Sequence, residues 1–119
     1  MMQNNNGSTG KSAVEIEATD GSVQSLAPPN QLQRFEGIAF STSGNIIGVA
    51  TSDTNTVFLF RKKPDGRFED TPNWSINGLR SRLNYPHDLS FSLSGDTELL
   101  AVAQRAGSVS IYEKDPSND

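Results

Sequence analysis

Hydrophobic and polar residues alternate along most of the chain, which is the pattern of β-strands with one buried face. Residues 13–17 alternate, the pattern breaks at Asp20 and Gly21, and it resumes over residues 23–26. These segments predict a β-hairpin, because Asp-Gly tolerates the positive φ of a tight turn. No later stretch keeps apolar residues at helical spacing for about 11 residues. The pattern therefore predicts an all-β fold.

Residues 36–62 and 87–114 follow one common pattern, which we interpret as an internal repeat. Each copy has an alternating strand ending in Phe-Ser, a Ser-Gly turn, a second strand ending in Val-Ala, a polar loop and a third apolar strand. Phe40 matches Phe91 at a spacing of 51 residues, and Val49 matches Val102 at a spacing of 53. The spacing changes only in the turns, so each copy predicts a meander of three antiparallel strands.

A fourth, outer strand containing Trp74 fits between the two copies, within residues 68–76. Four antiparallel strands repeated at about 50 residues are typical of a β-propeller blade, whereas a strand meander in a sandwich has no reason to repeat its turns. We expect a tail over residues 1–12, the outer hairpin of a preceding blade over 13–30, a complete blade over 31–80, the inner three strands of a further blade over 81–114, and a tail over 115–119. This makes nine strands, or about two and a quarter blades of an incomplete ring.

The two copies resemble the blades of the bacterial lactonase-like, YVTN and NHL-type β-propellers. The first copy reads "EGIAFSTSGNIIGVA" followed by "NTVFLFRK", and the second reads "YPHDLSFSLSGDTELLAVA" followed by "GSVSIYEK". The resemblance covers about residues 36–114 and implies the blade fold. Because such propellers serve as enzymes, cargo binders and scaffolds, it leaves the function open.

The composition narrows the possible partners. The 119 residues carry a formal net charge of −4, without the clustered basic residues that bind a phosphate backbone, so we expect no nucleic-acid partner. The chain has no cysteine, which excludes disulfides and thiolate metal sites. No apolar run approaches the ~20 residues of a membrane span, and the first residues do not form the basic and apolar pattern of a signal peptide. We therefore expect a soluble chain.

Candidate site residues fall where each repeat starts its first strand and where it joins its second strand to its third, because a propeller brings these segments to one rim. They are Glu36, Asp53, Asn55, His87, Asp88 and Arg105. Their oxygen and imidazole groups could bind a divalent cation or do acid–base work on a small substrate. The structural alternative is that His87 and Asp88 orient a turn, and that Glu36 caps its strand or pairs with Arg34.

Glu36 and Gly37 also resemble the Glu-Gly at the start of a blade in gluconolactonase-like propellers, which implies a metal-ligand role for Glu36. The other ligands of that family come from blades that this chain does not contain. No cysteine and no Gly-x-Ser-x-Gly motif supplies a nucleophile. We expect a binding or interaction scaffold without catalysis in this chain, partnered by the missing blades of a longer chain or by further copies of itself. The alternatives are part of a metal-dependent lactonase-like hydrolase, or a short chain that oligomerises into a ring.

Overall fold

The computed structural model describes residues 13–27, 34–78, 82–105 and 107–114. The expected tails over residues 1–12 and 115–119 lie outside this part of the chain. The described residues form nine β-strands and no helix, and all strand pairs are antiparallel, which confirms the all-β prediction. None of the described segments is a helix that could cross a membrane.

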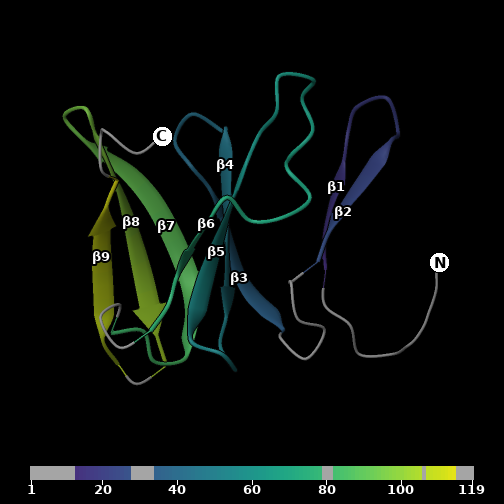
Figure 1. Cartoon of the computed structure of the whole chain (residues 1–119). Coiled ribbons are helices and arrows are strands. Elements are labelled where there is room, and N and C mark those ends of the chain that lie inside the picture. The colour runs from purple at the N-terminus through teal and green to yellow at the C-terminus, as the bar shows by residue number, and fades with distance from the viewer. Residues whose placement is uncertain (1–12, 28–33, 79–81, 106, 115–119) are drawn as a thin grey trace.

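The strands form three separate sheets that follow one another along the chain (Figure 1). The hairpin consists of β1 (Val14–Glu17) and β2 (Val23–Leu26). The middle sheet has the order β3 (Phe35–Phe40), β4 (Ile46–Thr51), β5 (Thr56–Arg61) and β6 (Trp74–Ile76). The third sheet has the order β7 (Pro86–Ser94), β8 (Thr97–Gln104) and β9 (Val109–Glu113). The fourth strand expected within residues 68–76 is therefore shorter than its segment.

The middle sheet is covered on both faces, because strands β4 and β5 carry apolar residues at successive positions rather than at alternate ones. One face, with Ile47, Val49, Phe58 and Phe60, packs against the hairpin. The opposite face, with Ala50, Val57 and Leu59, packs against the third sheet. The middle sheet is thus the central layer of three.

Gln24 fastens the hairpin to the middle sheet. Its side-chain Nε2 donates to the carbonyl oxygen of Phe68 at 2.6 Å, and the N–H of Phe68 donates to its Oε1 at 2.8 Å. Gln24 is buried, so these bonds satisfy an amide that would otherwise lose its contact with water. At the far end of the hairpin, hydrogen bonds from the hydroxyl and the backbone N–H of Ser22 lower the pKa of Asp20.

The backbones of the middle and third sheets approach each other closely at Gly37. A Cβ atom at this position would lie 2.5 Å from the carbonyl oxygen of His87 and 3.1 Å from the backbone nitrogen of Asp88. Both are main-chain atoms, which cannot rotate away as a side chain can. Only glycine therefore fits where strand β3 meets strand β7.

The middle sheet packs against the hairpin, and the third sheet packs against the middle sheet, with the same face of the repeat. The third sheet packs on the middle sheet through Leu89, Leu100 and Val102. By the repeat spacing these residues correspond to Ile38, Ile47 and Val49, and the last two lie in the core beneath the hairpin. The sheets are therefore stacked head to tail, each turning the same face toward the preceding one.

Candidate functional site

Glu36 and His87 occupy the same structural position in the two repeats. The pairing of β3 with β4 shifts between Phe35 and Gly37, and the pairing of β7 with β8 shifts between Pro86 and Asp88. Each candidate is thus the extra residue of a β-bulge at the start of the first strand of its sheet, and each side chain is exposed. A bulge redirects a side chain out of the regular alternation, and bulges are frequent beside functional sites.

Glu36 is held by the loop that follows strand β4. The hydroxyl of Ser52, which is buried, donates a hydrogen bond to Oε2 of Glu36. The neighbouring Asp53 accepts a hydrogen bond from the backbone N–H of Arg34 at 3.3 Å. These bonds order the β4–β5 loop against the start of β3. Among the described interactions, Glu36 contacts Ser52 instead of the expected Arg34.

Asn55 and Arg105 are linked through the backbone of Tyr85. The N–H of Tyr85 donates to Oδ1 of Asn55 at 2.8 Å, and the N–H of Arg105 donates to the carbonyl oxygen of Tyr85 at 2.9 Å. Asn55 and Tyr85 have φ values of 52° and 55°, in the left-handed region that few non-glycine residues adopt. Both residues thus have a strained backbone, and a hydrogen bond joins them across the middle and third sheets. The surrounding structure holds this contact in place.

Two buried polar residues that the sequence did not single out organise these loops. Thr51 and Gln104 end the second strand of their repeats, at a spacing of 53 residues. The Thr51 hydroxyl lies 2.7 Å from that of Thr54, and Gln104 donates to the hydroxyl of Ser110 at 2.7 Å while it accepts from the N–H of Asn84. The sequence signal that could have identified both residues is a polar residue directly after the repeated Val-Ala.

The structure places the six predicted residues at the strand starts and loops at one end of the middle and third sheets, which we call the rim, without a common coordination centre. Asp88 accepts a hydrogen bond from the N–H of its own neighbour Leu89 at 3.2 Å. Within the described residues, no three His, Asp or Glu side chains lie close enough to hold a metal ion. The described carboxylate and imidazole side chains alone therefore do not form a metal site around Glu36.

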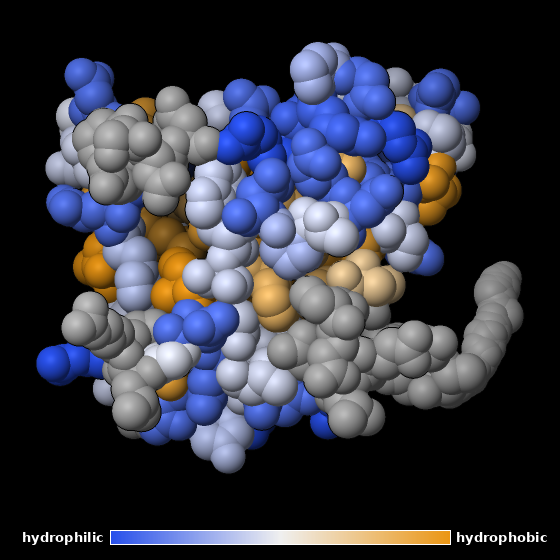
Figure 2. Space-filling model, viewed as in Figure 1, coloured by the Kyte–Doolittle hydropathy of each residue, from blue (hydrophilic) through white to orange (hydrophobic). Residues whose placement is uncertain are grey.

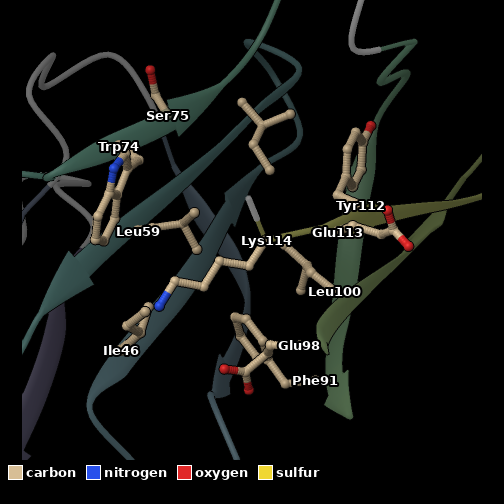
Figure 3. A pocket seen from close by; sticks show the side chains of 11 residues that line it. Ile46, Leu59, Trp74, Ser75, Phe91, Glu98, Leu100, Tyr112, Glu113 and Lys114 are labelled. Atoms are coloured by element: carbon tan, nitrogen blue, oxygen red, sulfur yellow. The ribbon is translucent and has the colours of Figure 1, made fainter. Parts of the chain in front are cut away.

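A cavity of about 270 Å³ lies away from this rim, between the outer strands of the middle and third sheets (Figure 3). Trp74 forms part of its wall, and the guanidinium of Arg61 lies 4.9 Å from the centre of the Trp74 ring, in a cation–π contact. Figure 3 shows the side chain of Lys114 extending across the cavity toward Ile46. The walls are formed by Ile46, Leu59, Trp74, Ser75, Ile76, Phe91, Glu98, Leu100, Tyr112, Glu113 and Lys114.

Comparisons with protein-family models, with curated proteins and with solved structures find no match to this chain. The function is therefore inferred from the geometry of the sheets, the rim and the cavity.

Proposed function

We propose that this chain is an interaction scaffold built from β-propeller-type blades, without catalysis of its own, and that the outward face of the third sheet is its binding surface. The carrying observation is the exposure of Val109 and Ile111, each 64% accessible, on strand β9. Their counterparts in the repeat are Val57 and Leu59, which pack between the middle and third sheets. The binding surface is thus the face that the preceding sheet uses to hold its neighbour.

The surface is made of the outward side chains of β8 and β9, which lie opposite one another in the strand pairing. Ala101 pairs with Ile111, and Ala103 pairs with Val109. Figure 2 shows hydrophobic residues on the left side of the molecule, where strand β9 lies in Figure 1. Full burial of a valine or isoleucine side chain is worth about 1.5–3 kcal/mol, so covering this surface supplies a substantial driving force for association.

Strand β7, the inner strand of the third sheet, adds little apolar area to the binding surface. Asp88 and Ser90 on β7 stand where the middle sheet has Gly37 and Ala39. Polar side chains there do not allow the close backbone approach seen at Gly37, so the apolar contact is concentrated on β8 and β9. The partner that fits is a further sheet carrying an apolar face of the same repeat.

In the isolated chain, a second copy offers such a face. Ile38 and Phe40 on strand β3 are 46% and 52% exposed, on the face that the hairpin covers only in part. Contact between this face of one copy and the β8–β9 surface of another is head to tail, as it is inside the chain. Such an interface uses two different surfaces, so the association can continue beyond a dimer.

The substitution Ile111→Lys tests this proposal, because it places a charge in the centre of the apolar surface. Light scattering over a concentration series should show the original chain above its monomer mass of 12.9 kDa at high concentration. Ile111→Lys should weaken association by roughly tenfold or more, the equivalent of about 1.4 kcal/mol. Ser25→Lys adds the same charge on the exposed side of β2 and should leave association unchanged. Equal association of Ile111→Lys and the original chain would contradict the proposal.

A further inference from the structure

The cavity between the middle and third sheets has a filled counterpart within the same chain. Three residues that line it correspond by the repeat spacing to three residues of the middle sheet: Phe91 to Phe40, Leu100 to Ile47 and Tyr112 to Phe60. On the middle sheet, these three residues surround the ring of Phe68. Phe68 lies in one core cluster with Ile47 and Phe60, and its ring centre is 6.2 Å from that of Phe40. The cavity thus occupies the position that Phe68 fills in the preceding repeat.

The backbone around Phe68 shows how a chain reaches this position. Phe68 forms an antiparallel bridge with Lys62, and the N–H of Glu69 donates to the carbonyl oxygen of Arg61 at 2.8 Å. Glu113, the last residue of strand β9, and Lys114, which follows it, correspond to Arg61 and Lys62, and both border the cavity. Among the described strands, β9 is the edge of its sheet, whereas its counterpart β5 is paired with β6 on that side. An edge strand beside an apolar cavity is the arrangement that binds an extended peptide by strand addition.

We propose that this cavity is a peptide-binding site, in which an extended segment of another polypeptide runs antiparallel to the end of β9 and inserts one aromatic side chain. The volume of about 270 Å³ suffices, since an apolar protein cavity of ~150 Å³ already holds benzene. The inserted ring lies against Phe91, Leu100 and Tyr112, as Phe68 lies against their counterparts.

The charges at the cavity indicate which type of residue follows the aromatic residue in the bound peptide. Of the charged residues that the structure describes, Glu98, Glu113 and Lys114 border the cavity, and only Lys114 among them is basic. On the middle sheet, the residue after Phe68 is Glu69, and it pairs through its backbone with Arg61. Glu113 takes the place of Arg61, and like charges directly opposite one another are unfavourable. The segment that fits therefore has a basic residue directly after its aromatic residue.

Synthetic peptides test this inference with the full chain. The sequence GRFKDTPN is residues 66–73 of this chain with the change Glu69→Lys. Its binding should change the emission of Trp74, the only tryptophan, because Trp74 borders the cavity, and the change should saturate with peptide. GRAKDTPN, without the aromatic ring, should bind roughly tenfold more weakly or worse. GRFEDTPN should fall between the two. The anisotropy of fluorescein-labelled peptides gives the same constants independently of Trp74.

Two matched variants locate the binding. Ile76→Phe adds a ring at the cavity wall and should abolish binding of GRFKDTPN. Asn77→Phe adds the same ring one residue away, at an exposed position that is not part of the cavity wall, and should bind normally. Circular dichroism verifies that both variants are folded. Equal affinity for GRFKDTPN and GRAKDTPN, or no saturable binding in either assay, overturns the inference. Ile111 lies on the face of the third sheet opposite to the cavity. The Ile111→Lys variant should therefore still bind GRFKDTPN although its self-association is weakened, so the peptide site and the proposed function can fail independently.

Discussion

Replacing Phe60 with alanine is expected to cost about 3–5 kcal/mol of the free energy of unfolding, the range typical for removing a buried phenylalanine. The Phe60 side chain is fully buried on strand β5, in the core between the middle sheet and the hairpin. The surrounding strands are paired on both sides of β5, so they cannot close the resulting space. Because native domains have only about 5–15 kcal/mol of stability, the variant should lose a large share of its free energy of unfolding.

Tyr112 provides the matched control, because it is the counterpart of Phe60 in the second repeat and is only partly buried. Tyr112 borders the cavity, so its removal enlarges an existing space and uncovers less packed surface. Urea unfolding followed by circular dichroism should therefore show a clearly smaller loss for Tyr112→Ala than for Phe60→Ala. Equal losses would mean that the two repeats are equally covered, against the three-layer arrangement described above.

Replacing Gly37 with alanine should destabilise the junction between the middle and third sheets, although alanine usually stabilises such a position. Where the backbone is not left-handed, Gly→Ala raises stability by about 0.4–1 kcal/mol through the unfolded chain. At Gly37 the added Cβ would lie 2.5 Å from the carbonyl oxygen of His87, so strands β3 and β7 must move apart. Overpacking of this kind costs about 1–3 kcal/mol, which exceeds the entropic gain.

Hydrogen exchange and urea unfolding measure this effect, and Gly44→Ala is the control. Gly44 has a φ of +80°, and an added Cβ there would meet no atom within 4 Å, so its substitution costs backbone strain alone, about 1–2 kcal/mol. Gly37→Ala should speed exchange in β3 and β7 together, whereas Gly44→Ala should act only on its own turn. A Gly37→Ala variant more stable than the original chain would show that the sheets do not meet at this point.

The alternation and the internal repeat predicted the strands well, because both report which side chains face a core. The Asp20-Gly21 turn and the second strand of each repeat follow directly from these patterns. The short β6 was harder, since its three residues include only Trp74 and Ile76 as apolar positions. The role of Gly37 could not be predicted, because it depends on the backbone of a strand 50 residues away.

The candidate rim was predicted only in part. Loop positions with Glu36, Asn55 and Arg105 were recognisable from the repeat, but their partners were not. Tyr85 contributes its backbone rather than its ring, and backbone contacts leave no mark in the sequence. The cavity was missed for a different reason: it depends on the difference between the two repeats around Phe68, which appears only when the sheets are compared in space.

The labelling rates of two single-cysteine variants test the central claim most directly, that equivalent faces of the middle and third sheets are covered and open, respectively. Because the chain has no cysteine of its own, Val57→Cys and Val109→Cys each introduce a unique thiol at corresponding positions. At low protein concentration, a thiol reagent should label Val109→Cys on the order of 100-fold faster than Val57→Cys, since a buried thiol reacts only after local opening. Equal rates at the two positions would contradict the claim: two fast rates would mean that the sheets do not stack, and two slow rates would mean that the β8–β9 surface is already covered.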